Sequence, residues 1–400
     1  MTDVVTRPAL SMAARIGLAA ALLAYGVLAI GSGADRLSEG QPDLATKVPQ
    51  LFAAEAIRTA GAQALAAGQA NTAAKLGARA LASAPTDPQS AAMFGAGWFA
   101  SGDSITADRA FRIAGQLGWR VPITQSYWMG QALEAGNYDI AALRLDALLR
   151  QQPDLLRQRQ LTDPMERNPA GRSALVKRMN LAPVWLNSYA GDVWDLPADV
   201  AMQRADVLDE AARSGLVLGC EMIGPITARL AVVGHPRVGS DLWRKHCPAA
   251  GTGLISDGDL TTLDISVKSS TFAWEIIGNG ELSLSVLPSR YGRGKRLVVE
   301  GVTDIPRSIL AQLVVLDPGR YLLSWRSGDS QGQPSDHILA ALTCPGEEPI
   351  WLSRTLDRRA GLWRAAVNID GRCLAQQLTF AAAAGAGRVW LEEISLLRAP

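Results

Sequence analysis

The chain has almost no excess of charge of either sign. Its 400 residues hold 39 lysines and arginines against 38 aspartates and glutamates, which leaves a net charge of +1. Without a long basic run, nothing supplies the electrostatic attraction on which nucleic-acid binding depends. Three histidines and four cysteines also leave little material for metal or thiol chemistry. We therefore expect neither a nucleic-acid partner nor a bound metal.

Common sequence motifs of catalysis are missing as well. The chain contains no GxSxG nucleophile elbow, no HExxH pair, no Walker loop and no dinucleotide-binding glycine motif. Neighbouring carboxylates in a strand point to opposite sides, so Glu347-Glu348 and Glu392-Glu393 are not expected to work as acid–base pairs. We expect a protein that is not an enzyme and needs no cofactor.

One long apolar segment lies near the N-terminus. From Ala13 to Gly31 every residue except Arg15 is apolar or small, which is enough for one membrane-spanning helix. Basic residues precede this segment and acidic residues follow it, so the sequence predicts a single-pass inner-membrane protein with its C-terminal bulk in the periplasm. The alternative is a cleaved signal peptide, because Ser32-Gly33-Ala34 offers small residues at a cleavage position.

The cysteines fit an oxidising compartment. Their positions favour two disulfides, Cys220–Cys247 and Cys344–Cys373, each within one domain. One alternative is four free buried thiols. Another is a zinc site, which the irregular spacing makes the weaker interpretation; its ligands would be Cys220, His235, His246 and Cys247.

A 34-residue period runs through the first helical region. Glycines recur at this spacing where a tight turn would precede a second helix, and small alanines recur where two helices would pack closely. These positions are Gly68, Gly102, Gly136, Ala73, Ala107 and Ala141. Over roughly residues 54–155 the chain resembles tetratricopeptide repeat proteins. It departs from that pattern at Trp119, where a proline is usual, and at Met129, where a small residue is usual.

The resemblance implies a concave groove, lined by the first helix of each pair, that binds an extended peptide or a partner helix. Candidate groove residues are Trp98, Gln125, Trp128 and Gln131. Core packing is the alternative for both tryptophans. Beyond Arg157–Arg172, which reads as a loop, helical patterning continues to about residue 250 and predicts further degenerate helix pairs.

From about residue 251 the pattern changes to short alternating strands. Ten candidates lie between Phe272 and Leu397, including Ile350–Leu352, and they suggest a two-sheet jelly-roll sandwich. The runs Leu316–Arg326 and Val389–Leu396 resemble carbohydrate-binding-module jelly rolls. The combination of this domain with helical repeats and a membrane anchor is similar to that of accessory proteins of bacterial exopolysaccharide assembly.

Aromatic faces with nearby polar groups are the usual means of sugar recognition. For each tryptophan, packing in the core is the alternative. The candidate glycan-binding residues are Trp351, Trp363, Trp325, Arg326, Tyr291 and Asp336. The basic run Ser289–Arg296 surrounds Tyr291 at a predicted hairpin tip and would suit an acidic polysaccharide, or would simply be a solvated hairpin.

The sequence therefore predicts a multidomain α plus β chain: a tail and transmembrane anchor (1–34), tetratricopeptide-like repeats of an α-solenoid (35–155), degenerate helical repeats (156–250) and an antiparallel β-sandwich of jelly-roll type (251–400). The expected function is a periplasmic scaffold that binds a protein partner through its repeats and a polysaccharide through its sandwich. A polysaccharide lyase or hydrolase with its site in the sandwich groove is one alternative. A purely structural role for both domains is another.

Overall fold

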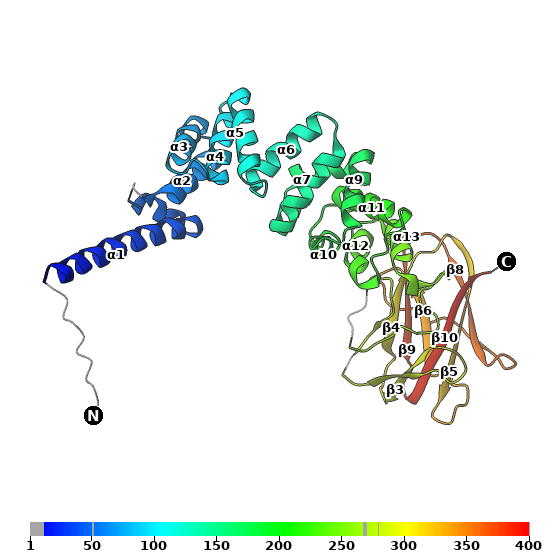
Figure 1. Cartoon of the computed structure of the whole chain (residues 1–400). Coiled ribbons are helices and arrows are strands. Elements are labelled where there is room, and N and C mark those ends of the chain that lie inside the picture. Colours follow the sequence, from blue (N-terminus) through cyan, green and yellow to red (C-terminus); the bar gives the residue numbers. More distant parts are fainter. Residues whose placement is uncertain (1–11, 50–51, 267–269, 279, 400) are drawn as a thin grey trace, which may run out of the picture. The chain divides into compact units, whose positions relative to one another are not determined.

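The structure, a computed structural model, describes residues 12–49, 52–266, 270–278 and 280–399. The chain divides into two compact units, Met1–Gln151 and Gln152–Pro400. Helices make up the first unit and the beginning of the second, and antiparallel sheets make up the rest (Figure 1). The predicted multidomain α plus β fold is confirmed. The later helices and the sandwich belong to the same C-terminal unit.

The N-terminal unit begins with the long helix α1 (Met12–Gly40). Its 29 residues rise about 44 Å, which exceeds the hydrocarbon thickness of a bilayer. Among the described residues it is the one helix long and apolar enough to cross a membrane, and the same test accepts a signal sequence. Large apolar side chains such as Leu23 and Ile30 are exposed along it.

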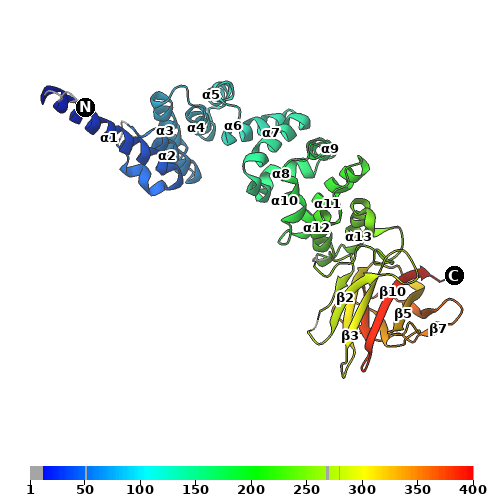
Figure 2. The same ribbon diagram turned by 60° about the horizontal axis from the view of Figure 1, so that its bottom comes forward.

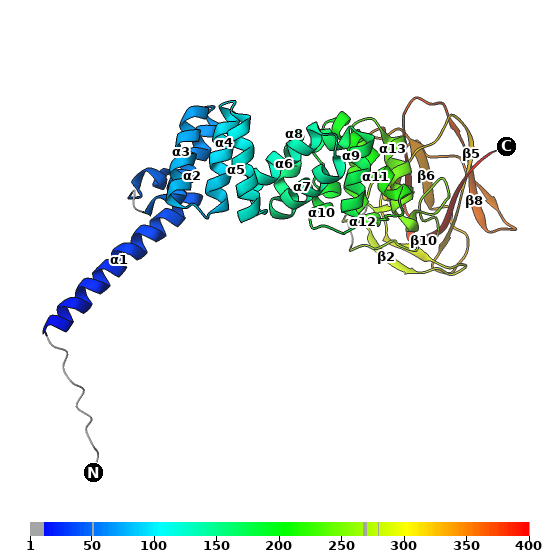
Figure 3. The same ribbon diagram turned by 45° about the horizontal axis from the view of Figure 1, so that its top comes forward.

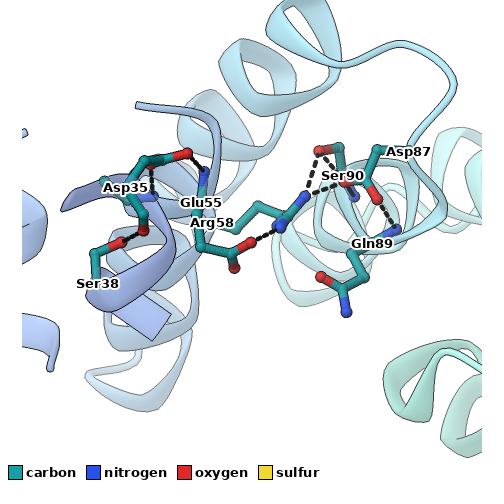
Figure 4. A network of polar contacts seen from close by, with 8 residues as sticks. Asp35, Ser38, Glu55, Arg58, Asp87, Gln89 and Ser90 are labelled. Carbon is teal, nitrogen blue, oxygen red and sulfur yellow. Dashed lines mark hydrogen bonds and ion pairs between the residues drawn. The ribbon is translucent and has the colours of Figure 1, made fainter. Parts of the chain in front are cut away.

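The C-terminal end of α1 packs on the first repeat. Gly31 lies against the ring of Phe52, where a Cβ atom would clash, and Ala34 joins a small apolar cluster that includes Ile57 and Ala80. Asp35 accepts hydrogen bonds from the backbone N–H groups of Glu55 and Ala56, at 3.0 and 2.9 Å (Figure 4). Asp35 thus satisfies N–H groups at the start of the next long helix.

A second aspartate connects the first repeat to the next one. Asp87 caps a helix by accepting from the N–H groups of Gln89 and Ser90, and it also forms an ion pair with Arg58 (Figure 4). Arg58 bonds Glu55 as well. Hydrogen bonds from Ser90 lower the pKa of Asp87 and outweigh the opposing effect of burial, which is the largest single influence.

Three helix pairs confirm the 34-residue period. The first helices begin at Ala54, Pro88 and Pro122 and the second helices at Ala70, Ser104 and Tyr138, each one period apart. Gly68, Gly102 and Gly136 all have positive φ at the turn within a pair, as predicted. The helices are α2 (Ala54–Ala66), α3 (Ala70–Ser83), α4 (Pro88–Ala100), α5 (Ser104–Leu117), α6 (Pro122–Glu134) and α7 (Tyr138–Gln151), and a 3-10 turn, η1 (Pro42–Lys47), precedes them.

The pairs do not stack equally. Helices α3 and α4 lie side by side (Figure 3). They touch backbone to backbone, because Gly77 faces the backbone of Phe94 and Gly97 faces that of Ala74. One period later Phe111 replaces Gly77, and its ring stacks on Tyr127 with centroids 4.0 Å apart. The bulky pair holds α5 and α6 farther apart, and their contact is much sparser.

The C-terminal unit begins with further helices. The segment predicted as a loop, Arg157–Arg172, contains helix α8 with Pro164 inside it, because Met165 and Glu166 pack into the core. The helical patterning predicted beyond this segment is interrupted at Ala182, which has positive φ and lies between Met179 and Leu186. The helices are α8 (Arg159–Glu166), α9 (Pro169–Met179), α10 (Leu186–Gly191), α11 (Ala198–Arg213), α12 (Cys220–Val232) and α13 (Pro236–His246), with 3-10 turns η3 (Pro153–Arg157) and η4 (Pro248–Ala250).

Ten strands in the described residues form two antiparallel sheets. The four-stranded sheet has the order β1-β4-β9-β6 and the six-stranded sheet the order β2-β3-β10-β5-β8-β7 (Figures 1 and 2). One apolar core fills the space between them, so the predicted sandwich is confirmed. The strands are β1 (Glu275–Ile276), β2 (Ser283–Pro288), β3 (Lys295–Gly301), β4 (Arg307–Val314), β5 (Gly319–Asp329), β6 (Ile338–Thr343), β7 (Thr355–Asp357), β8 (Leu362–Ile369), β9 (Gln376–Ala382) and β10 (Gly387–Arg398).

Local details of the sandwich differ from the prediction. The strand expected at Ile350–Leu352 is reduced to a single bridge between Trp351 and Ala341, and β7 lies a few residues later. Both predicted disulfides, Cys220–Cys247 and Cys344–Cys373, are present. Cys220 and Cys247, which the zinc alternative would use as ligands, are therefore bonded to each other.

Candidate functional site

The tip of the β2–β3 hairpin contacts the outer face of the six-stranded sheet, the face turned away from the core. Ser289 shapes the tip: its hydroxyl accepts from the N–H groups of Tyr291 and Gly292, at 3.2 and 2.9 Å. The N–H of Arg290 donates to the Glu392 carboxylate on β10, at 3.0 Å. This bond joins residues far apart in sequence and fixes the hairpin against the sheet.

Tyr291 is the centre of this arrangement. Its ring lies 5.9 Å from that of Trp390, and the guanidinium of Arg326 lies 4.6 Å from its centroid, yet the residue is 55% exposed. Arg326 is held in turn by Glu393, at 2.7 Å, and by the carbonyl of Ala360. A cation over an aromatic ring adds attraction and restricts the ring's motion. The Tyr291 cluster comprises Arg290, Tyr291, Arg326, Trp390, Glu392 and Glu393.

A β-bulge brings the two glutamates of the cluster to the same face. The register of β10 against β5 shifts between Glu392 and Ser395, and Glu393 has φ of +52°. Both carboxylates consequently contact residues of the outer face, so the expectation that they point to opposite sides was wrong. Glu392 is fully buried, and Glu393 is paired with Arg326.

Positive charge predominates around Tyr291. Arg296 is desolvated by burial, which lowers the pKa of its guanidinium, and the nearby charge of Arg290 lowers it further. Among the described residues, no carboxylate forms an ion pair with Arg290 or with the exposed Arg293. The guanidinium of Arg290 instead lies 5.7 Å from the ring of Trp390. These two cations are available to an anionic ligand.

A second group forms around Trp363, on the core-facing side of β8. Arg354 lies 5.8 Å from the Trp363 ring and donates to the backbone carbonyl of Asp336, so it connects two of the predicted residues. Trp363 and Trp351 are both half-buried, and Asp336 is exposed. The structure thus brings Tyr291 and Arg326 together in one cluster and connects Trp363 with Asp336 through Arg354, whereas Trp351 bridges to Ala341 on β6. Arg354 was missing from the predicted glycan-binding set, and only its basic character would have indicated it.

Trp325 is not a surface residue. It is fully buried between the sheets and packs edge-on against Phe380. Its place on β5 alternates with Arg326, so the core takes Trp325 and the outer face takes Arg326. Its selection as a glycan-binding residue is corrected.

The predicted partner groove is mostly filled by packing. Gln125 is fully buried and accepts a hydrogen bond from Arg144, at 3.3 Å, so it cannot line an open groove. Trp98 and Trp128 are half-buried against the apolar cluster around Phe111. Gln131 donates to Glu134 of its own helix. Core packing, the alternative for both tryptophans, accounts for their contacts.

Comparison with known proteins identifies no relative by sequence. No family model matches the chain, and no curated protein matches it. Solved structures match 37% of the chain, in its C-terminal part, at 10–15% identity and TM-scores of 0.24–0.28. They include a protein classed as sugar-binding from Bacteroides thetaiotaomicron VPI-5482 (10% identity, TM-score 0.28, all of that chain). A second match is TmCBM61 in complex with β-1,4-galactotriose (15% identity, TM-score 0.24, all of that chain). A third is the enzymatically active domain of tailspike protein 4 of bacteriophage CBA120 (10% identity, TM-score 0.25, 21% of that chain).

Proposed function

We propose that the chain is a non-enzymatic, membrane-anchored periplasmic scaffold in surface polysaccharide synthesis or export. Its sandwich binds an anionic glycan at the Tyr291 cluster, and its tetratricopeptide-like repeats hold a protein partner. The observation that carries the glycan half is the half-exposed Tyr291, supported by Arg326 and flanked by two arginines that form no ion pair with a carboxylate in the described part of the chain.

The geometry of Tyr291 suits a sugar ring. A pyranose presents C–H groups on one side, which pack on an aromatic face, and hydroxyls at its edge, which need polar partners. Contacts with Arg326 and Trp390 hold the Tyr291 ring in place before any ligand arrives, so little side-chain entropy is lost on binding. A rigid, shallow platform of this kind favours recognition of a chain segment.

The charge of the surroundings selects the class of glycan. Arg290 and Arg293 lie within two residues of Tyr291, and Arg290 is fixed by its backbone bond to Glu392. A guanidinium binds a carboxylate or sulfate through two parallel hydrogen bonds. A uronic-acid or sulfated polysaccharide fits this arrangement better than a neutral one.

The carboxylates of the cluster favour binding over catalysis. Glycoside hydrolysis needs two carboxylates that face each other across a sugar, one of them free to give a proton. Glu392 is buried beneath the hairpin, and Glu393 is in an ion pair. An enzyme would need these groups exposed to substrate, which argues against the lyase or hydrolase alternative.

Helix α1 supports the anchored form. Ser32, Gly33 and Ala34, the residues of the alternative cleavage site, lie inside this helix, and Asp35 caps α2 directly after them. Two disulfides favour an oxidising compartment for the remainder of the chain. We therefore favour an intact anchor, with the repeats close to the membrane surface.

The protein partner is proposed to dock on the repeats outside the predicted groove. Phe99, Ile105 and Trp119 are each more than half exposed, and large exposed apolar side chains commonly mark interaction surfaces. Photo-crosslinking from position 105 in cells should yield one discrete adduct. Position 23, in α1, is the reference site for crosslinking outside the repeats. Absence of any adduct from position 105 would contradict this half of the proposal.

Affinity electrophoresis of the detergent-solubilised full chain tests the glycan half. We expect retention in gels containing polygalacturonate, weaker retention in dextran, and loss of retention on Tyr291→Ala. Trp119→Ala is the matched control, because Trp119 is also 55% exposed and also lies next to an arginine, with Arg120 5.2 Å from its ring. Equal mobility of the wild type in all gels would overturn the proposal.

A further inference from the structure

A cavity of about 580 Å³ lies within the C-terminal unit, between the last helices and the beginning of the sandwich. One wall is a single face of α12, formed by residues 220, 221, 224, 225 and 228. The others come from Trp243 and Cys247 at the end of α13, from residues 249 and 250, and from described residues within 256–264 and 270–274. Cavities of this volume are typical of small-molecule sites. The cavity is separate from the Tyr291 cluster, none of whose residues lines it.

The walls are aromatic and fixed. Trp243 and Trp274 both line the cavity and are almost fully buried. The Trp274 indole donates to the carbonyl of Asp257, at 3.0 Å, and the disulfide Cys220–Cys247 joins α12 to the residue after α13. Such walls hold their shape without a ligand, which favours binding of a rigid apolar body.

Acceptors at the cavity give it a preference for positive charge. Pro225 has no N–H, so the backbone carbonyl of Glu221, one turn earlier, has no helical donor. The acidic residues Glu221 and Asp264 also line the cavity, both are exposed, and hydrogen bonds from Ser266 keep the pKa of Asp264 low. No basic residue lines the cavity within the described part of the chain.

Two buried polar groups at the cavity lack partners. The indole N–H of Trp243 and the hydroxyl of Ser270 are buried, and neither forms a hydrogen bond in the described structure. An unsatisfied buried group costs roughly 1–3 kcal/mol, which an acceptor on a ligand or a water in the cavity would offset. This observation is independent of the cavity's size and charge, and it too indicates an occupant.

We propose that this cavity binds a small organic cation: an ammonium group attached to a ring-sized apolar body. The body lies between Trp243 and Trp274, where a cation also gains from the aromatic faces. The ammonium group donates to the Glu221 carbonyl and to the carboxylates of Glu221 and Asp264. Hydroxyl or ether oxygens on the body would accept from Trp243 and Ser270.

Calorimetric titration of the solubilised full chain with three probes of equal size tests the proposal. We expect phenethylamine to bind at least ten-fold more tightly than 2-phenylethanol, and 3-phenylpropionate to bind most weakly. Glu221→Gln, a change at an exposed side chain, should reduce the preference for the amine about three-fold or more. Tyr291→Ala should leave amine binding unchanged, which separates this site from the proposed glycan site.

A cavity-filling variant locates the binding. Ala228→Trp should abolish amine binding, whereas Ala231→Trp, at a half-buried α12 position outside the cavity, should not. Circular dichroism establishes that both variants are folded, and if Ala228→Trp is not, Asp264→Asn joins Glu221→Gln as the deciding variant. Equal affinity for all three probes, amine binding that persists in folded Ala228→Trp, or an amine preference unchanged in Glu221→Gln would overturn the proposal.

Discussion

Replacing Gly97 by alanine probes the close packing of α3 against α4. A Cβ atom at Gly97 would lie 2.5 Å from the backbone N and Cα of Ala74. Carbon atoms in contact normally stay about 3.5–4.0 Å apart, so α4 would have to move by about 1 Å. Backbone atoms of a neighbouring helix cannot rotate away as a side chain can. The substitution therefore strains the contact between the first and second repeats.

The expected magnitude follows from two opposing effects. Alanine is favoured over glycine in a helix by about 1 kcal/mol. Overpacking of a close contact costs about 1–3 kcal/mol, and a clash with backbone atoms at Gly97 places the cost at about 2–3 kcal/mol, so Gly97→Ala should be destabilising by roughly 1–2 kcal/mol. In a unit of this size each kcal/mol corresponds to about 2–4 °C, which predicts a fall in the melting temperature of about 2–8 °C. Gly130, in α6, has no atom within 4 Å of its added Cβ, so Gly130→Ala should raise it by about 2–4 °C.

Circular dichroism melts of the full chain give the two shifts, and hydrogen exchange in peptides from α3 and α4 locates the loss. Faster exchange should be confined to these helices in Gly97→Ala. Equal stabilisation by both alanines would refute the reasoning, because it would mean that α3 and α4 do not approach at Gly97.

Other predictions concern buried groups of the C-terminal unit. Burial lowers the pKa of His246, which is neutral in the fold: its Nδ1 accepts from the Leu218 N–H and its Nε2–H donates to the Leu208 carbonyl. The contribution of neutral His246 to the stability of the fold is therefore present above about pH 6.5 and is lost as the pH falls. Urea unfolding at pH 7.5 and 5.5 should show this loss as a fall in the free energy of unfolding of up to about 1.4 kcal/mol per pH unit. This pH dependence should be smaller in His246→Gln, and an equal pH dependence in the variant would contradict the role of His246. Arg204 pairs with the buried carboxylate of Glu166, at 3.6 Å, so Arg204→Met should cost about 3–5 kcal/mol in urea unfolding by removing the only charge paired with it in the described residues. Adding Glu166→Leu should recover most of this loss, and no recovery would contradict the pairing. Removing Cys344–Cys373, which closes a loop of 29 residues, should cost about 3–4 kcal/mol in the same assay, and a cost below about 1 kcal/mol would contradict its role.

Much of the helical architecture could be predicted because it repeats. The glycines at 68, 102 and 136 mark turns in sequence and adopt positive φ in the structure. The unequal stacking was also visible in principle, since Phe111 occupies the column of Gly77. The broken helix at Ala182 was not, because a residue with an ordinary side chain gives no local signal of positive φ.

The candidate site was harder to predict than the sandwich that carries it. Alternation along β5 places Trp325 with Tyr321 and Leu323 on the core face, so its burial could have been read from the pattern. By contrast, Tyr291 meets Trp390 through a hairpin and a strand about a hundred residues apart, and the bulge at Glu392 decides which side chains meet. Pairing of this kind depends on the register of distant strands, which a single sequence does not specify.

The most direct measurement is a titration of the full chain with oligogalacturonate at several salt concentrations, for the wild type and for Tyr291→Ala. The account predicts binding that weakens as salt rises, since two arginines meet the anionic chain, and an affinity at least ten-fold lower without the aromatic ring. No binding by the wild type, or equal affinity of the two proteins, would contradict the claim that the Tyr291 cluster is a glycan site.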